Sequence, residues 1–253
     1  MIKKAKSVLR KNEFVFLLAR TVSYAVRRLI GLTLGKMRRP FQVRTYLREH
    51  KVRKLHVGCG PNLYEGWLNT DGFPARSGIV YLDATRRLPF ENASWDFIYS
   101  EHFIEHISLR ETYRLLQESF RCLKPGGVLR IATPDLVKIC ALLQDEVNRQ
   151  QVAKHYIDHL ATTCLPGFPC RSPAVAVNLS LREWGHKFIF DFKTLSELLG
   201  QVGFKDITEC AVSKSEHLSL QGIEKHGEAI GSEDFNLLET MVVEATKPST
   251  LVK

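Results

Sequence analysis

The chain has 253 residues, of which 44% are hydrophobic, 9% aromatic and 25% charged, and its formal net charge is +9. This composition excludes a disordered chain, a collagen and a small disulfide-stapled scaffold, and the length suffices for one large α/β domain with an appendage. The charge is uneven: residues 1–53 hold 15 of the 36 Lys and Arg residues but only two acids, so this segment is +13 and the rest of the chain is −4. The sequence therefore predicts a mildly acidic body that carries a basic N-terminal segment.

The basic segment has the pattern of an amphipathic helix over residues 14–30, with apolar residues at helical spacing and arginines on the opposite side. The arginines leave no apolar run long enough to span a bilayer. Three roles stay open: packing on the body as a lid or oligomer element, contact with an anionic membrane surface through residues 1–35, or contact with nucleic acid. Residues 36–40 are predicted as a linker, because Pro40 blocks continuation of a helix.

Six cysteines are spread through the chain, and no apolar run followed by a small-residue cleavage site is evident. We therefore expect reduced thiols in a cytosol-like compartment. The predicted location is cytoplasmic, with a peripheral position at the inner membrane face as an option that the basic segment leaves open.

From residue 51 onward, short apolar runs alternate with helical stretches, which is typical of an α/β sheet. Strands are predicted at residues 54–57, 67–71, 79–82, 95–100, 128–132, 205–212 and 240–246. Helices are predicted over residues 108–123, 135–160 and 194–203, two of them opened by capping boxes, Ser108 with Glu111 and Thr194 with Glu197. Residues 162–173 contain three prolines and are predicted as a loop.

A glycine loop, Gly58-Cys59-Gly60, follows directly after the first predicted strand. Such a loop indicates a tight turn that a ligand can approach closely, because side chains would obstruct it. Asp71 ends the second strand, where an acid can accept hydrogen bonds from a ribose diol, and Asp83 follows the third strand. Taken alone, these residues can equally be a tight turn and strand-end caps.

Further motifs follow in a fixed order: Gly-Trp-Leu-Asn-Thr-Asp at 66–71, Asp-Ala-Thr-Arg-Arg-Leu-Pro-Phe at 83–90, Trp-Asp-Phe-Ile-Tyr at 95–99, Glu-His-Phe-Ile-Glu-His at 101–106 and Leu-Lys-Pro-Gly-Gly at 123–127. With the glycine loop, this set resembles the class I S-adenosylmethionine-dependent methyltransferases, in a type 11-like branch often found with bacterial glycan and small-molecule biosynthesis. The resemblance covers about residues 52–205. It implies a Rossmann-like α/β fold with a seven-stranded, mostly parallel sheet, whose last strand is antiparallel, flanked by helices. The predicted organisation is a helical arm and linker over residues 1–50 and a methyltransferase domain over residues 51–248.

The resemblance also implies S-adenosyl-L-methionine as cofactor. The cofactor-binding residues that it implies are Gly58, Cys59, Gly60, Asp71, Asp83, Ala84, Ser100 and Glu101. The glycine loop would contact the methionine moiety through its backbone, Asp71 the ribose hydroxyls, and Asp83 the adenine amino group. Only 10 residues separate Gly60 from Asp71, too few for the helix that usually joins these two strands.

The implied activity is in-line methyl transfer to a small-molecule, sugar or lipid-linked glycan acceptor. A hydroxyl acceptor needs a general base near pH 7, and His102, His106 and His186 are the candidate catalytic residues because imidazole titrates there. A carboxylate or thiolate acceptor would need no base. Nucleic acid is disfavoured as a partner, since the body is net acidic. The alternative is a non-catalytic cofactor-binding or scaffold protein that retains the fold.

Two histidine-containing motifs resemble metal sites. The segment 102–106 matches the H-x-x-E-H pattern of a zinc peptidase class if both histidines share one helix face, which keeps a zinc hydrolase as a remote alternative. A second set consists of His155, His159, Cys164 and Cys170, but its Cys-x5-Cys spacing exceeds the usual zinc range. No metal is predicted, because the glycine loop and the strand order fit the methyltransferase resemblance.

Overall fold

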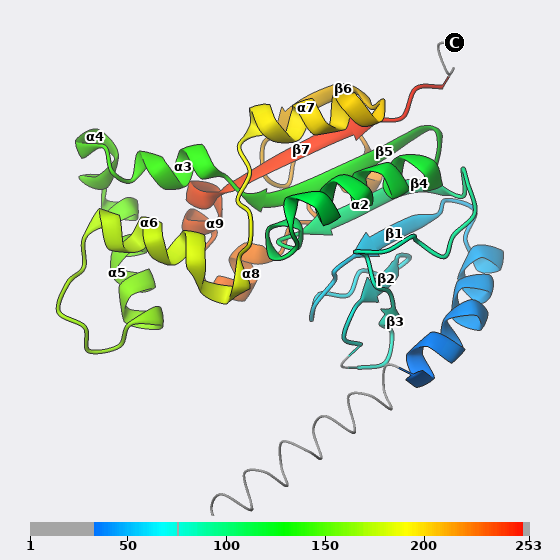
Figure 1. The fold of residues 1–253 in the computed structure, drawn as a ribbon, viewed down its shortest axis with the longest axis horizontal. Coiled ribbons are helices and arrows are strands. Elements are labelled where there is room, and N and C mark those ends of the chain that lie inside the picture. The colour runs from blue at the N-terminus through cyan, green and yellow to red at the C-terminus, as the bar shows by residue number, and fades with distance from the viewer. Residues whose placement is uncertain (1–32, 75, 250–253) are drawn as a thin grey trace, which may run out of the picture.

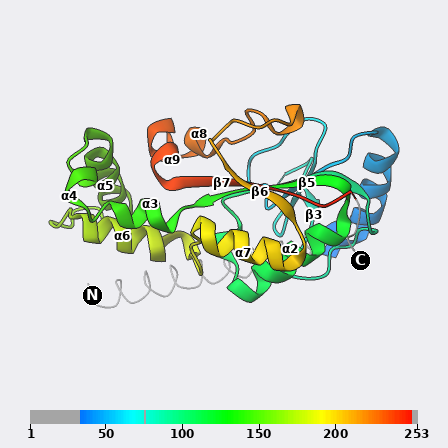
Figure 2. The same cartoon turned by 90° about the horizontal axis from the view of Figure 1, so that it is seen from above.

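The computed structural model describes residues 33–74 and 76–249, which form a seven-stranded sheet with helices on both faces (Figures 1 and 2). The strands are β1 (Lys54–Val57), β2 (Leu68–Asp71), β3 (Val80–Tyr81), β4 (Trp95–Glu101), β5 (Leu123–Pro134), β6 (Lys205–Cys210) and β7 (Thr240–Thr246). The helices are α2 (Leu109–Cys122), α3 (Leu136–Ala141), α4 (Asp145–Asn148), α5 (Gln151–Cys164), α6 (Pro173–Arg182), α7 (Phe192–Val202), α8 (His226–Ile230) and α9 (Glu233–Glu239). The described residues also include a helix over 33–49 and the 3-10 turns η1 (Ile104–His106), η2 (Glu183–Gly185) and η3 (Leu218–Leu220).

The strand order is β3-β2-β1-β4-β5-β7-β6. Strands β1 to β5 pair in parallel, whereas β7 runs antiparallel to both β5 and β6. This confirms the predicted fold class, including the antiparallel last strand. Parallel strands need cover on both faces. Figure 2 shows α2 and α7 on one side of the sheet and α8 and α9 on the other.

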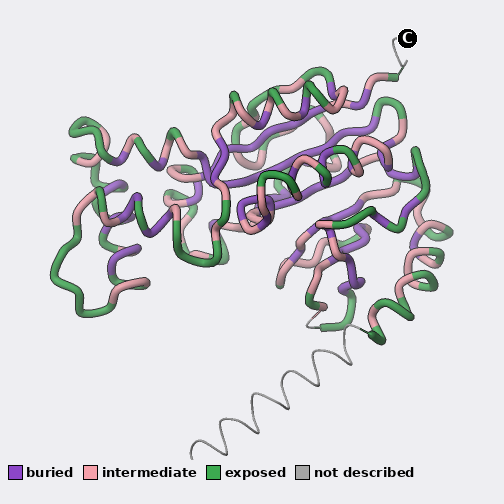
Figure 3. The backbone as a smooth tube through the Cα atoms, viewed as in Figure 1, coloured by how far each residue is buried: buried purple, intermediate pink, exposed green. Residues whose placement is uncertain are grey.

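Most of the sheet is buried (Figure 3). Leu55, Ile98 and Leu129, on three neighbouring strands, are between 0% and 3% exposed and belong to one central apolar cluster. A second apolar cluster lies apart from it and includes Ile139 of α3 and Tyr156 of α5. Besides the sheet core, the described residues thus form a smaller helical core beyond the ends of β4 and β5, and a third small cluster includes Trp67 and Tyr99.

Of the two predicted capping boxes, one is confirmed and the other is wrong. The box at α2 is confirmed, since the Ser108 side chain accepts from the backbone N–H of Glu111 and the Glu111 carboxylate accepts from that of Ser108. The predicted box of Thr194 and Glu197 is wrong. Asp191 is the N-cap of α7 and accepts from the N–H of Thr194 at 3.0 Å, so Thr194 already lies inside the helix and cannot cap it.

The single helix predicted over residues 135–160 is wrong. The segment forms α3, α4 and α5, and Gln144 and Gln150 adopt extended backbone between them. These breaks let α3 and α5 both bury apolar faces in the helical core. The predicted loop at 162–173 overlaps the last turn of α5, and α6 was not predicted, although Ser172 caps it and Pro173 stands at its first turn.

Residues 33–49 are helical, so the linker predicted at 36–40 is wrong. Pro40 removes one backbone donor from this helix, at a cost of about 3 kcal/mol. Tertiary packing offsets that cost. Tyr46 is only 7% exposed, packs in the central cluster, and accepts the N–H of Lys54 at 2.8 Å, while Lys36 and Arg39 lie over the ring of Tyr81.

The C-terminal part of the predicted arm therefore packs on the sheet core. Residues 1–32 lie outside the described part of the chain, so the amphipathic helix at 14–30 and the membrane contact through residues 1–35 stay predictions. Within the described ranges, no helix is both long and apolar enough to cross a membrane.

Candidate active site

The predicted cofactor residues come together at one edge of the sheet, where β1 to β4 end. Val57 pairs with Thr70 and with Ser100, so the glycine loop emerges between the ends of β2 and β4. Strand β3 pairs with β2 up to Asp71, and Asp83 leaves the same edge two residues beyond β3. The carboxyl edge of an open parallel sheet is where ligands bind in such folds.

The two glycines of the loop have different surroundings. Both have positive φ, +68° at Gly58 and +50° at Gly60, a conformation that favours glycine. A Cβ added at Gly58 would lie 2.4 Å from the ring of Phe103, so this position is required for packing. A Cβ at Gly60 would have no described atom within 4 Å. Gly60 therefore faces open space that a ligand can occupy.

The two strand-end acids brace the loops around them. Asp71 accepts the backbone N–H of Gly60 at 3.0 Å and so holds the glycine loop. Asp83 accepts from the N–H and hydroxyl of Thr85 through one oxygen, and its other oxygen lies 3.0 Å from Arg86 Nε. A carboxylate has about four lone-pair sites, so each acid can still accept from a ligand. Both act as turn caps, and both remain available as acceptors.

Three small side chains line the same edge. Cys59 is buried, and burial raises the pKa of its thiol to about 12, which keeps it neutral at pH 7. Ala84 packs in the central cluster beside Asp83. The hydroxyl of Ser100 is buried without a hydrogen-bond partner among the described residues. An orphaned hydroxyl at the end of β4 is a group that a bound polar ligand can satisfy.

Glu101 has a partner that its motif did not predict. One of its oxygens accepts the backbone N–H groups of Lys225 and His226, at 2.7 and 2.8 Å. Burial raises the pKa of this carboxyl, and the two backbone bonds oppose that shift. Glu101 thereby ties the end of β4 to the start of α8.

The histidines of segment 102–106 do not share a helix face, so that expectation is wrong. Strand β4 runs to Glu101, and the N–H of His102 still bonds to the carbonyl of Ala132 at 2.9 Å. His102 has a φ of +43°, and the short turn η1 begins only at Ile104. Pairing with β5 therefore keeps His102 on the sheet, and only His106 lies in the short turn η1.

His102 is fully engaged. Its Nδ1 lies 3.3 Å from Glu105 and its Nε2 lies 3.0 Å from the hydroxyl of Thr240. Burial opposes the charged form, but Glu105, with smaller contributions from Glu239 and Glu101, raises the pKa of His102 above its ordinary value. In turn His102 outweighs burial and lowers the pKa of Glu105. The two form a buried ion pair, which leaves His102 no free nitrogen to act as a base.

A cavity of about 450 Å³ lies beside this pair, between the ends of β4 and β5 and the elements η1, α5, η2, α8 and α9. The histidines that line it are His102, His106, His159, His186 and His226. The structure therefore brings the three predicted catalytic histidines to one cavity. His102 joins this cavity to the cofactor edge, because it directly follows Ser100 and Glu101 in the chain.

His106 and His186 face each other across the cavity wall, with ring centroids 4.9 Å apart. Burial lowers the pKa of His106, and the charges of His186 and His102 lower it further against the effect of Glu105. His106 is therefore neutral near pH 7. The Nδ1 of His186 lies 2.6 Å from the carbonyl of Ser180, which fixes the orientation of this ring.

The motif analysis missed a second histidine–carboxylate pair in the cavity. His226 Nε2 lies 2.9 Å from Glu239, and the hydroxyl of Tyr156 donates to the other oxygen of Glu239. Burial raises the pKa of Glu239, but His226, His102 and Tyr156 together lower it below its ordinary value, so the carboxyl is ionised. The ring of His226 stacks on His102 at a centroid distance of 3.5 Å. This places a carboxylate-bound imidazole in the cavity.

One signal could have found Glu239. It directly precedes β7, and the start of β7 pairs with the end of β5, Thr240 opposite Pro134. A polar residue before an antiparallel last strand lies at the same edge as those that follow the parallel strands. His226 has no comparable signal, because no motif surrounds it.

Glu105, His106 and His186 each place one possible metal-ligand atom within 4.8 Å of the other two. In residues 33–74 and 76–249 this is the one such group of three, and His102 is not in it. The second predicted set does not converge, since His155 is exposed on α5 and Cys170 is exposed in the following loop. The zinc-hydrolase alternative thus loses the helical histidine pair on which it depended.

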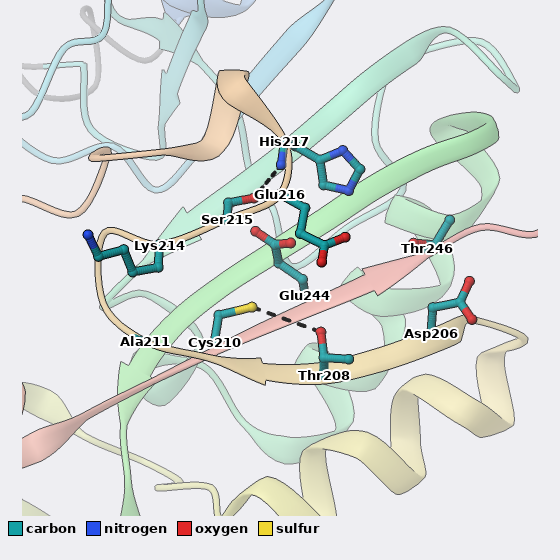
Figure 4. A pocket seen from close by; sticks show the side chains of 10 residues that line it. All are labelled: Asp206, Thr208, Cys210, Ala211, Lys214, Ser215, Glu216, His217, Glu244 and Thr246. Carbon is teal, nitrogen blue, oxygen red and sulfur yellow. Dashed lines mark hydrogen bonds between the residues drawn. The ribbon is translucent and has the colours of Figure 1, made fainter.

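A larger cavity, about 700 Å³, lies elsewhere, beside the edge strand β6 (Figure 4). Thr246 lines it and pairs with Val128, near the start of the parallel part of β5. The cavity runs along β6, and none of the predicted site residues lines it. The smaller cavity is the candidate active site, because the predicted catalytic residues His102, His106 and His186 line it.

Comparison with known proteins gives one family match: residues 67–131 match the family model of a methyltransferase domain. This match runs from the residue before β2 into β5 and includes Asp71, Asp83, His102 and His106. No curated protein matches the chain.

Several solved structures are similar to the chain. An S-adenosylmethionine-dependent methyltransferase from Mesorhizobium loti is 17% identical, with a TM-score of 0.47, over 80% of this chain and 96% of that one. A SAM-dependent methyltransferase from Archaeoglobus fulgidus is 16% identical, with a TM-score of 0.45, over 85% of this chain and 93% of that one. Phosphoethanolamine N-methyltransferase 2 from Haemonchus contortus, in complex with S-adenosyl-L-methionine, is 15% identical, with a TM-score of 0.40, over 78% of this chain but only 49% of its own length.

These likenesses are too distant to inform the function of this chain. The family match stands independently of them, and it covers β2, β3 and β4, from which Asp71, Asp83 and Ser100 extend, but not β1 and the glycine loop. Together with the confirmed sheet, the family match supports S-adenosyl-L-methionine as the cofactor and S-adenosyl-L-methionine-dependent methyl transfer as the activity.

Proposed function

We propose that the chain transfers a methyl group from S-adenosyl-L-methionine to a hydroxyl-bearing small molecule, sugar or lipid-linked glycan held in the 450 Å³ cavity. The observation that carries this proposal is the continuity of two half-sites. The glycine loop and the acids occupy the ends of β1 to β3, and the histidine-lined cavity begins where β4 ends.

The cofactor half-site fits the proposed group. Gly60 offers backbone facing open space, Asp71 and Asp83 offer carboxylate lone pairs, and Ser100 offers an unpaired hydroxyl. When bound, S-adenosyl-L-methionine supplies a methyl group on a positively charged sulfur, which keeps the C–S electron pair as the methyl leaves. The neutral thiol of Cys59 adds no competing thiolate nucleophile to this edge.

The acceptor half-site offers a proton acceptor. As the oxygen of a hydroxyl acceptor bonds to the methyl carbon, its proton has to leave. The Glu239 carboxylate accepts a hydrogen bond from the Nε2–H of His226. The Nδ1 of His226 is therefore the nitrogen that accepts the proton of the acceptor hydroxyl. His102 stays paired with Glu105 and positions the ring of His226 by stacking. His106 and His186 line the same cavity.

This arrangement favours an enzyme over a scaffold that retains the fold. A binding protein needs no carboxylate-bound histidine beside its ligand, whereas a general base needs one that is oriented by a third group. The pair of His226 and Glu239 meets that requirement on the acceptor side of the edge.

The cofactor half-site is tested with a matched pair of glycine variants. Gly60→Ala and Gly167→Ala each add a Cβ at positive φ with no described atom within 4 Å, so each costs about 1–2 kcal/mol of stability. Calorimetric titration with S-adenosylhomocysteine, the demethylated product, should show an affinity loss of about a hundredfold for Gly60→Ala alone. Equal affinity in both variants would contradict the proposed cofactor site.

A further inference from the structure

We propose that Glu105, His106 and His186 bind one divalent transition-metal ion in the wall of the acceptor cavity. The three donor atoms lie within 4.8 Å of one another. Two donor atoms of a tetrahedral zinc ion are about 3.4 Å apart, since each bond is about 2.1 Å and the angle between bonds is about 109°. Side-chain shifts of up to about 1 Å therefore close the site.

The carboxylate is already aimed at the cluster. Glu105 is completely buried, and its Oε2 accepts from the hydroxyl of Thr133 at 3.1 Å. Its Oε1 lies 3.3 Å from His102 Nδ1, its ion-pair partner, and 3.9 Å from His106 Nε2. A carboxylate oxygen has more than one lone-pair site, so Oε1 can bind a cation beside His106 while it stays paired with His102.

Hydrogen bonds to the backbone orient both imidazoles, as they do in metal-binding histidines. The carbonyl of Ser180 accepts from His186 Nδ1 at 2.6 Å, and the backbone of Trp184 hydrogen-bonds His106. The turn that carries Trp184 is itself tied to η1, because the carbonyl of Glu105 accepts the N–H of Lys187 at 2.7 Å. These bonds join two segments about 80 residues apart into one preorganised group.

The donor set indicates the class of ion. Two imidazoles and one carboxylate suit zinc and the neighbouring first-row metals, whereas magnesium and calcium prefer oxygen ligands alone. Three protein ligands leave at least one coordination position open, and all three residues line the 450 Å³ cavity. Resting on the proposed function, we infer that this open position binds an oxygen of the acceptor, so that His106 and His186 act on the acceptor through the ion.

The test is calorimetric titration of the chelator-treated full chain with Zn²⁺, and with Co²⁺ as a spectroscopic probe. We expect one equivalent of metal ion to bind per chain. The visible spectrum of the Co²⁺ form should be that of an ion with a low coordination number. His106→Ala and His186→Ala should each weaken binding at least tenfold. His155→Ala is the control, because it removes an exposed imidazole outside the cavity and should change nothing. Glu105→Gln is the third ligand variant, and near-ultraviolet circular dichroism checks that it folds.

Two results would overturn the metal site: no stoichiometric binding to the wild-type chain, or binding that survives both His106→Ala and His186→Ala. Titration of the same chelator-treated sample with S-adenosylhomocysteine separates the two proposals. If the cofactor product binds and the metal does not, only the metal site fails. If the metal binds and the cofactor product does not, the proposed methyltransferase function fails while the metal site stands.

Discussion

The two halves of the candidate site are built in different ways. The cofactor half consists of turns that directly follow strands β1 to β3, and each is held by contacts within about a dozen residues, such as Asp71 to Gly60. The acceptor half is assembled from segments far apart in the chain. His102 bonds to Thr240 across 138 residues, and Glu101 holds the backbone of His226 across 125.

This difference distinguishes the part of the site that proteins of one fold can share from the part that can vary between them. Local turns at strand ends are reproduced whenever the strands form, so a common cofactor can be bound by short motifs. A cavity closed by remote helices changes with every insertion and packing change. We therefore expect variants of the cofactor half to act on cofactor affinity, and variants of the long-range contacts to act on the acceptor half.

The largest effect is expected where long-range contacts are cut. Arg130 is completely buried and binds Glu224 and Glu244 at 2.6 and 2.5 Å, as well as the carbonyl of Lys214. Arg130→Met would leave both carboxylates without their cation and should destabilise the fold by about 3–5 kcal/mol in urea unfolding. Hydrogen exchange should show protection lost over residues 213–226 but kept in β1.

Arg149→Met is the matched control, since Arg149 is exposed and pairs with the exposed Asp145. Little change in stability is expected from it. If the two variants lose equal stability, or if β1 loses protection together with residues 213–226, the contrast between a local and a long-range half is wrong.

A somewhat smaller loss of stability is expected at low pH, because a histidine is buried in β1 beneath the cofactor half. His56 of β1 is 1% exposed, and burial lowers its pKa to about 4 from the ordinary 6.5. Below pH 6.5 the unfolded chain binds a proton that the folded chain excludes, so this group's contribution is complete above 6.5 and falls by about 3 kcal/mol as pH drops to 4.

Urea unfolding at a series of pH values between 7 and 4 measures this loss. His56→Gln removes the titrating group and should have a shallower acid dependence than the wild type over that range. Parallel curves for the two proteins would show that His56 does not carry this acid sensitivity.

Next in size is Asp83→Ala. A hydrogen bond to a charged group contributes about 1.5–3 kcal/mol, so the affinity for S-adenosylhomocysteine should fall about ten- to a hundredfold. The comparison variant is Glu91→Ala, which removes an exposed acid nearby that belongs to neither half-site. An unchanged affinity for Asp83→Ala, measured by calorimetry, would remove this acid from the cofactor half.

The smallest effect is expected from the basic segment. Deletion of residues 1–32 should change the affinity for S-adenosylhomocysteine by less than about twofold, because none of the residues assigned to either half-site lies there. Co-sedimentation with anionic liposomes should fall in the same variant, since that segment holds much of the basic excess. Unchanged sedimentation would argue against the membrane role of residues 1–35.

The same division explains how much could be predicted from the sequence. The sheet and the positions of Gly58, Gly60, Asp71 and Asp83 were predictable because each depends on a contiguous pattern: an apolar run, then a turn or an acid. The wrong predictions arose where contacts with other elements override the local pattern. The backbone at His102 bonds to β5 instead of entering a helix, and Pro40 is tolerated because Tyr46 anchors its helix to the core.

In the acceptor half, only His102, His106 and His186 could be selected, and their roles depend on remote partners. His102 could be proposed as a base until Thr240 and Glu105 were seen to occupy both nitrogens. The pairing of His226 with Glu239 requires α8 and α9 to fold back beside β7, which no local pattern predicts.

The most direct test of the account is calorimetric titration of the wild-type full chain with S-adenosylhomocysteine in the presence of chelator. We expect one molecule to bind per chain with a micromolar Kd. An absence of binding under these conditions would contradict the central claim that the edge formed by β1 to β4 is a methyl-donor site.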